Sequence, residues 1–263
     1  MIDAHCHLDR FAPERDPAEA LAEALAVGVR RVVVAGVDPA GWRAQAALAR
    51  AHMQVSCTYG LHPWTVAAAP DEALPGLLTE LERALDGGLG VAPVGLGELG
   101  LDHGRRGPAP TRPRQEAAFR AQLRMARARA LPVVLHLVSA PGRALQILRE
   151  EGLSAGGLIH RYSGSAELVP AFLALGLYLS FSAEILYKPR LLDALRRVPL
   201  DRLLLETDAP DALPASAGGA AVGLSALPQI VAAAAAARGE DPAELARATA
   251  AAATRLLGLP ASS

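Results

Sequence analysis

The sequence predicts one (β/α)8 barrel, in which parallel strands alternate with covering helices, followed by an extra helix at the C-terminal end. Three observations predict it. Strand-like runs of Val, Leu and Ile alternate with Ala-, Leu- and Arg-rich segments of helical period, about eight times over the 263 residues. The strand-like runs lack polar alternation, as strands covered on both faces do. Several of them end in a side chain that can bind a metal ion.

The first half of the chain opens with a short strand at 2–5 and a helix at 16–28. The helix begins at an Asp-Pro pair and stops at a Gly, which matches the usual asymmetry of helix caps. Strands follow at 31–37, 54–62 and 91–99, where β-branched and Leu residues lie between Gly, Pro and polar residues.

The second half continues the alternation. It has helices at 114–130 and 141–152 and strands at 132–138, 156–162, 177–183 and 202–208. We expect a long loop from Ala209 to Gly223 and the extra helix from about Asp241 to Leu257. No linker divides the chain, so 1–263 is predicted to be a single domain. A doubly wound open sheet fits less well, because no Gly-rich phosphate turn follows the first strand.

Composition narrows the functional class. A net charge of -1 gives no global basic field for nucleic acid, although a local basic patch remains possible. A content of 20% charged residues with a positive mean hydropathy argues against disorder. Cys6 and Cys57 are too few for a disulfide framework. Neither a signal peptide nor an apolar run of about 20 residues is present. We therefore expect a cytoplasmic protein with no membrane partner and no obligate protein partner.

Side chains that commonly bind metals stand at the ends of five predicted strands. They are His5, His7, Glu98, His136, His160 and Asp208. A buried polar group without a partner costs roughly 1–3 kcal/mol, so this repetition needs a common reason. The carboxyl ends of barrel strands meet at one face, where barrel enzymes place their active sites. The pattern predicts a divalent metal centre there.

Taken singly, these residues have structural alternatives. His5 and His7 are two residues apart, so on a strand both imidazoles point to the same side and suit one ion. Otherwise one is a hydrogen-bonded core residue and the other a loop residue. Glu98 can bridge two cations, or it can cap the next helix or pair with Arg105 or Arg106.

His136 and His160 end consecutive strands and would lie side by side, although a lone histidine at a strand end is more often structural. Asp208 can bind metal and accept a proton from the nucleophilic water, or it can cap a turn before Pro210. Mixed nitrogen and oxygen ligands without thiolate fit one or two ions of Zn, Mn, Mg, Co or Ni. Cys6 points away from its two histidine neighbours and is interpreted as a packing residue.

A series of segments from Ile2 to about Leu257 resembles one known family. The segments are MIDAHCHLD, YGLHPW, GELGLD, LPVVLH, HRYSGS, SFSAEILYK and LLLETDAP. Together they resemble the TatD family of metal-dependent hydrolases, within the amidohydrolase-like barrels. The resemblance implies a (β/α)8 barrel with one or two divalent ions and deoxyribonuclease activity. It implies one ion held by His5, His7, Glu98 and Asp208, and a second held by Glu98, His136 and His160.

The resemblance also indicates substrate contacts. His62, in GLHPW, matches a histidine beside the family's site and could contact the scissile group, or it could be a loop histidine packed on Trp64. Trp64 could stack on a base of a single-stranded end. Arg161 stands where the family usually has Cys or Thr. It could bind phosphate, or it could pair with Glu184 or Asp211.

The chain departs from the family pattern at several further positions. The usual Arg after the fifth strand is missing, as are an Arg and an Asn in the loop after the last strand. An Asn-Ala pair near the C-terminus is replaced by Ala252 and Ala253. Because Arg is the usual bidentate clamp for phosphate, these losses weaken the expected binding of a polyanion.

We expect metal-assisted hydrolysis of a phosphodiester at the 3′ end of single-stranded DNA, with Asp208 as base and Glu98 bridging or positioning the ions. A carboxyl ester or amide, such as an aminoacyl-tRNA-like ester, is the alternative substrate, because it needs fewer Arg clamps. The expected partner is therefore a nucleic-acid end or a small ester. The alternative from another class is a binding barrel that keeps its metal for folding.

Overall fold

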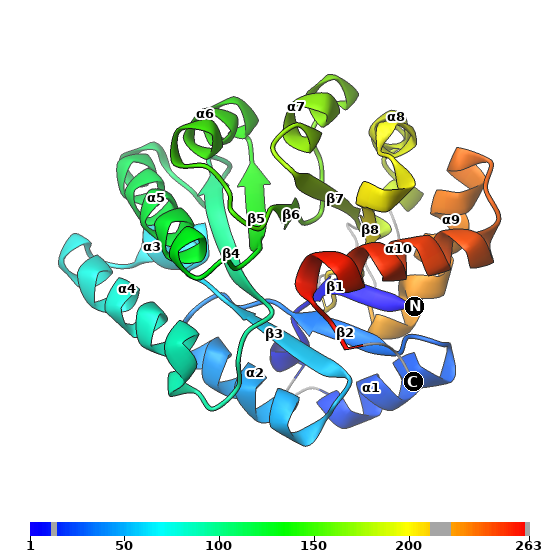
Figure 1. Ribbon diagram of the computed structural model, residues 1–263, viewed down its shortest axis with the longest axis horizontal. Helices are drawn as coiled ribbons and strands as arrows, with labels where there is room; N and C mark the ends of the chain where they lie inside the picture. The colour runs from blue at the N-terminus through cyan, green and yellow to red at the C-terminus, as the bar shows by residue number, and fades with distance from the viewer. Residues whose placement is uncertain (12–14, 211–221, 261–263) are drawn as a thin grey trace.

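The computed structural model describes residues 1–11, 15–210 and 222–260 and confirms the (β/α)8 barrel (Figure 1). Eight parallel strands follow one another around the sheet in chain order. They are β1 (Ile2–Cys6), β2 (Arg31–Val34), β3 (Val55–Tyr59), β4 (Gly95–Asp102), β5 (Val133–Val138), β6 (Gly157–Ile159), β7 (Leu177–Phe181) and β8 (Leu203–Leu205).

The barrel closes between its first and last strands. The amide of Asp208, just beyond β8, donates to the carbonyl of His5 at 3.0 Å, and the amide of His7 donates to the carbonyl of Ala209 at 2.7 Å. These bonds continue the parallel pairing past the end of β8. They hold three of the predicted ligands, His5, His7 and Asp208, on adjacent segments of backbone.

The helices lie outside the strands, as Figure 1 shows. They are α1 (Pro17–Ala26), α2 (Pro39–Ala51), α3 (Pro63–Ala68), α4 (Leu74–Arg83), α5 (Arg112–Ala128), α6 (Pro141–Glu151), α7 (Val169–Leu173), α8 (Arg190–Arg197), α9 (Leu227–Arg238) and α10 (Pro242–Leu257). Asp16 caps α1 by accepting from the amide of Ala18 at 2.9 Å, as the Asp-Pro start predicts.

The extra C-terminal helix closes the end of the barrel where the strands begin. Its buried Ala252, Ala253 and Leu257 pack against apolar side chains from the first residues of the strands, among them Val134 and Leu204. The small alanines allow the helix to approach closely. The replacement of the family's Asn-Ala pair therefore concerns packing at the end opposite the predicted ligands.

The opposite end carries backbone that is strained in the same way at three positions. Ser139, Arg161 and Asp208 follow β5, β6 and β8, and each has a positive φ, of 55°, 46° and 56° respectively. Such conformations cost non-glycine residues roughly 1–3 kcal/mol, and they persist where the surroundings fix them. Most of the predicted 209–223 loop lies outside the described residues. None of the helices described here is long and apolar enough to cross a membrane.

Candidate metal centre

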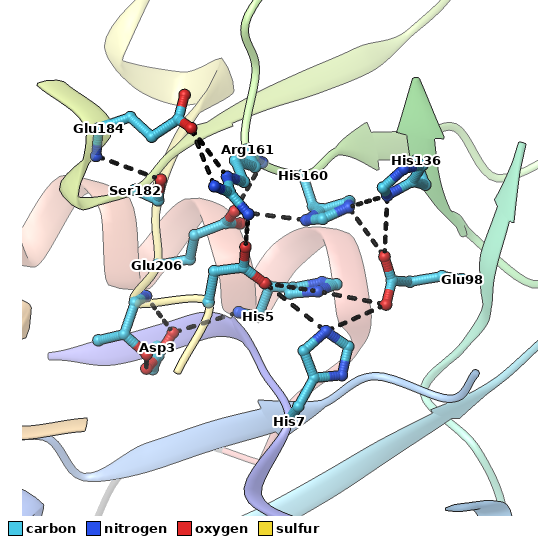
Figure 2. Close-up of polar contacts among 12 residues, drawn as sticks. Asp3, His5, His7, Glu98, His136, His160, Arg161, Ser182, Glu184 and Glu206 are labelled. Carbon is cyan, nitrogen blue, oxygen red and sulfur yellow. Dashed lines mark hydrogen bonds and ion pairs between the residues drawn. The ribbon is translucent and has the colours of Figure 1, made fainter. Parts of the chain in front are cut away.

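The predicted ligands meet towards the carboxyl ends of the strands, where Figure 2 labels His5, His7, Glu98, His136 and His160. Asp208 joins them through its contacts with His5 and His7. His5, Glu98 and His136 lie within β1, β4 and β5, whereas His7, His160 and Asp208 stand just beyond β1, β6 and β8, and each side chain is buried. The prediction that Glu98 ends its strand is wrong, because the pairing of β4 with β5 continues to Asp102.

His136 and His160 point into the barrel because side chains alternate along a strand with a period of two. They stand two residues after Val134 and Leu158, which point into the apolar cluster under α10 at the end where the strands begin. The prediction from strand ends thus identified one cluster, not scattered polar residues.

The first group of ligand atoms surrounds Nε2 of His5 and Nε2 of His7. Oε1 of Glu98 lies 3.6 Å from the His5 nitrogen and 3.3 Å from the His7 nitrogen. Oδ1 of Asp208 lies 3.6 Å from both nitrogens. The imidazole planes are nearly perpendicular, at 88°, so the two histidines approach this point from different directions.

The second group converges on the other oxygen of the same carboxylate. Oε2 of Glu98 lies 2.8 Å from Nε2 of His160 and 3.5 Å from Nδ1 of His136. These two ring nitrogens are 3.0 Å apart. Glu98 therefore presents one oxygen to each group, which is the arrangement required of a carboxylate that bridges two cations.

The donor set fits divalent ions. Nε2 of His5 and Oε1 of Glu98 are buried without a hydrogen-bond partner among the described residues, and leaving such atoms unpaired is costly. Imidazole nitrogens and carboxylate oxygens are ligands of Zn, Mn, Co and Ni, and the carboxylates also suit Mg. The ligand atoms of His5, His7 and Glu98 lie within 4.8 Å of one another, as do those of His5, His160 and Asp208. Glu98 and His136 form a third such set with His62.

The electrostatics of the site are dominated by burial and by Glu98. Burial and the neighbouring histidine His160 hold the pKa of His5 well below its usual value, which favours the neutral imidazole that a metal ligand requires. Burial opposes ionisation of Glu98, but the surrounding histidines outweigh it and hold the pKa of this carboxyl well below its usual value. Burial also disfavours charge on His160, but Glu98 and Glu206 together raise the pKa of this histidine well above its usual value.

Two carboxylates that sequence reasoning did not assign lie behind the histidines of the second group. Oδ2 of Asp102 is 3.5 Å from Nε2 of His136, and Oε1 of Glu206 is 3.6 Å from Nδ1 of His160. Each faces the ring nitrogen that points away from Glu98, so it favours the ring orientation that presents the other nitrogen. Both residues stand inside the motifs GELGLD and LLLETDAP, which was the available signal.

A third carboxylate that the sequence analysis did not assign, Asp3 in β1, connects the first strand to the segment just after β8. It accepts from the amide and hydroxyl of Thr207, at 3.0 and 2.6 Å, and lies 3.3 Å from the amide of His5. Burial raises its pKa to about 7, against the effect of these hydrogen bonds. Asp3 fixes the backbone on both sides of the first ligand group.

His62 and Trp64 lie beside the second group. His62 caps α3 through Nδ1, which accepts from the amide of Trp64 at 3.0 Å, and its Nε2 lies 3.7 Å from Oε2 of Glu98. Its packing on Trp64, with ring centroids 4.5 Å apart, is also present. The indole nitrogen of Trp64 donates to Asp102, and Arg106 lies over the ring at 4.2 Å. Both predicted positions of His62, beside the site and against Trp64, occur together.

Arg161 connects two carboxylates at the barrel mouth, the end of the barrel that carries the candidate ligands. Its Nη1 donates to Oδ2 of Asp208 at 2.9 Å, while Nε and Nη2 donate to Oε1 of Glu184 at 3.1 and 3.0 Å. The alternative pairing with Glu184 is therefore found, with a contact to a metal-ligand candidate in addition. Asp211, the other partner considered, lies outside the described residues.

A cavity of about 520 Å³ opens beside the second ligand group. Its lining includes His136, His160, Arg161, Glu184 and Lys188. A much smaller space of about 20 Å³ lies among the ligands themselves and is also lined by Arg161. The small space has room for little more than a water molecule, whereas the large one falls in the size range of ligand sites.

Known proteins resemble this chain over its whole length. The family model for TatD related DNases matches residues 2–258. The chain is 35% identical over 265 residues, and 97% of each protein, to the 3'-5' ssDNA/RNA exonuclease TatD of Cronobacter sakazakii. It is 33% identical over 214 residues, and 80% of each protein, to the uncharacterized metal-dependent hydrolase YjjV of Escherichia coli. The crystal structure of YjjV matches with a TM-score of 0.89 and 29% identity, over 99% of this chain and 98% of that one.

The barrel and its converging histidines and carboxylates define the class as metal-dependent hydrolases, in agreement with these relatives. Within that class, the chain belongs to the TatD related DNase family. The resemblance inferred from the motifs is confirmed.

Proposed function

We propose that this protein is a metal-dependent nuclease that cleaves phosphodiester bonds at the 3′ end of single-stranded nucleic acid. The observation that carries the proposal is the pair of ligand groups sharing Glu98 at the barrel mouth, next to a cavity of about 520 Å³. The exonuclease named among its relatives supports the choice of substrate. Its buried free cysteines, Cys6 and Cys57, suit the reducing cytoplasm in which we place it.

The proposed centre would hold up to two divalent ions, one for each ligand group. His5, His7 and Asp208 would hold one, His136 and His160 the other, and Glu98 would contribute to both. Bound there, such ions lower the pKa of a water molecule towards about 7 and neutralise charge on the attacked phosphate. We leave the choice among Zn, Mn, Mg, Co and Ni to the reloading experiment below.

Asp208 accepts a proton in the proposed reaction. The water oxygen attacks phosphorus, the bond from phosphorus to the 3′ oxygen of the preceding nucleotide breaks, and that oxygen takes a proton from solvent. Asp208 receives the proton lost by the water, and the backbone bonds that fix it beside His5 hold the acceptor in place. Glu98 keeps the two ligand groups at a set separation, because one short side chain serves both.

The substrate occupies the large cavity in this proposal. His62, whose Nε2 lies 3.7 Å from Glu98, contacts the scissile group, and Trp64 provides an indole edge and face near the cavity for a base. Arg106 lies over the Trp64 ring and His62 packs against it, so a base stacks on the part of the ring that lines the cavity.

The test is cleavage of an end-labelled single-stranded DNA oligonucleotide by metal-stripped protein, reloaded separately with Mg, Mn, Co, Ni and Zn. His160→Ala should abolish cleavage, whereas His52→Ala, at the C-terminal end of α2 and outside the ligand groups, should retain it. Cleavage that persists equally in His160→Ala would come from a contaminating nuclease. No cleavage with any ion, despite bound metal, would reject the nuclease proposal.

A second candidate, hydrolysis of a carboxyl ester or amide, rests on the charge of the cavity wall. Arg161, Lys188 and Arg190 share that wall with Asp102 and Glu184, so the cations are largely balanced by carboxylates. A neutral substrate suits such a wall better than a polyanion does. A panel of aminoacyl and lactone esters assayed beside the oligonucleotide separates the two: turnover of esters alone would select this candidate.

A further inference from the structure

Arg161 replaces the Cys or Thr usual in the family, and the structure gives it an unexpected partner. Its guanidinium lies within hydrogen-bond distance of Asp208, a candidate ligand and the proposed base, at 2.9 Å. Asp208 therefore has its two oxygens in different environments. Oδ1 faces the His5 and His7 nitrogens, and Oδ2 accepts from Arg161.

Glu184 anchors the guanidinium from the other side (Figure 2). Oε1 of this carboxylate accepts from Nε and Nη2 of Arg161, and Lys188 contacts the same oxygen at 2.7 Å. Glu184 itself is buried just after β7, where Ser182 accepts from its amide. The backbone of Glu184 is held by Ser182, and its Oε1 is held by Arg161 and Lys188, so it can serve as the attachment point of the guanidinium. Charge-assisted bonds of this kind are among the stronger ones.

The backbone of Arg161 is fixed as well. Its amide donates to Oε1 of the fully buried Glu206 at 2.6 Å, and its φ of 46° lies in the left-handed region that a side chain such as arginine rarely adopts. The same Glu206 faces His160. The residue is thus held at its amide and at its guanidinium, which is the condition for an unfavourable conformation to persist.

We propose that Arg161 is a positioning residue for the metal centre: anchored by Glu184, it directs the Asp208 carboxylate so that Oδ1 faces the first ligand group. Arg161 acts through Asp208 in this scheme, not by clamping the phosphate of the substrate. The turnover part of the inference rests on the proposed function, whereas the part concerning ion binding does not.

The experiment measures the dissociation constant of Mn²⁺ by titration of metal-stripped protein, together with kcat and KM for the oligonucleotide. Loss of a residue that orients a ligand typically weakens metal binding or activity roughly 10- to 100-fold. We expect Arg161→Met to weaken Mn²⁺ binding by this factor and to lower kcat at saturating ion, with KM little changed. Arg129→Met, which breaks an arginine–carboxylate pair with Asp86, should match wild type.

A double-mutant comparison separates positioning from a general structural effect. If Arg161 acts through Asp208, adding Arg161→Met to Asp208→Asn should weaken Mn²⁺ binding little further. The substitution to Asn has already removed the carboxylate charge that Arg161 contacts. Independent, multiplying effects would overturn the proposal. A raised KM with unchanged Mn²⁺ binding would also overturn it and identify Arg161 as a phosphate contact.

Glu184→Gln provides the second route if Arg161→Met does not fold. The amide keeps the shape of the side chain but removes the charge that anchors Arg161, so Mn²⁺ binding should weaken in the same direction. Wild-type Mn²⁺ affinity in this variant would contradict the anchoring role. A protein that binds Mn²⁺ as expected in every variant, yet cleaves no oligonucleotide or ester, would reject the proposed function and leave the positioning role intact.

Discussion

The two ends of the barrel are built from the same strands but have opposite character. At the end where the strands begin, Val134, Leu158 and Leu204 pack on α10 in an apolar cluster. Two residues further along two of these strands, the inward side chains become His136 and His160. A step of one pleat therefore separates the apolar cluster from the candidate metal ligands. The core of the barrel is therefore divided by position along the strands: apolar at their beginnings and polar towards their ends.

Asp208→Asn should have the largest effect, because it should abolish chemistry at the ligand end of the barrel and leave the apolar end unchanged. We expect kcat to fall by about 10²–10⁴-fold, the usual contribution of a positioned base. Metal content at saturating ion should be largely retained, since the amide oxygen can still face the histidines. Metal analysis and single-turnover cleavage check both parts. Unchanged turnover would remove Asp208 from its role as base.

Leu204→Ala should have the reverse pattern. The side chain is fully buried in the cluster under the barrel, and truncating such a leucine costs about 2–5 kcal/mol of unfolding free energy. Urea unfolding of metal-stripped protein measures this cost. Mn²⁺ affinity and kcat of the folded variant should match wild type. A large loss of ion affinity would show that the two ends are coupled.

Much of this architecture could be predicted from the sequence, because it depends on repeated local patterns. The alternation of apolar runs and helical segments is enough for the barrel, and strand ends are enough to group the ligand candidates. The extra helix was also predicted, from Asp241 to Leu257, and is observed as Pro242–Leu257. Most predicted strands were longer than those observed, as at 31–37 against Arg31–Val34, because apolar composition continues into the loops after the strands. The first strand was predicted one residue too short, and the strand predicted at 91–99 is observed as Gly95–Asp102.

The direction in which individual side chains point could not be predicted, because it depends on irregularities in the pairing between neighbouring strands. Register shifts occur in β1 between Asp3 and Cys6 and in β4 between Gly97 and Leu99. Such irregularities redirect side chains, and here they flank His5 and Glu98. The supporting roles of Asp102 and Glu206 were missed for a related reason: a carboxylate behind a ligand has the same sequence appearance as a ligand.

Removing the ions should lower the stability of the ligand end of the barrel without affecting the apolar cluster at the opposite end. Buried Glu98 and its histidines lose their compensating charge, whereas an ion present at 100 times its dissociation constant stabilises the fold by about 2.7 kcal/mol. Chelation should therefore lower the Tm, and Mn²⁺ should restore it. The Leu204→Ala cost should be the same in stripped and loaded protein if the two ends are independent. Chelation that leaves the Tm unchanged would argue against ions at this site.

Trp64→Ala gives the smallest expected effect and distinguishes binding from chemistry within the mouth. Stacking of a base on an aromatic ring contributes about 1–3 kcal/mol, so KM should rise with no change in unfolding of the lower cluster. The alanine also removes the donor to Asp102, which faces His136, and this loss should lower kcat. Trp64→Phe separates the two, because it keeps a ring but not the indole nitrogen: its KM should stay near wild type while kcat falls. An unaffected KM in Trp64→Ala would exclude stacking, and the role of Trp64 would then be confined to holding Asp102.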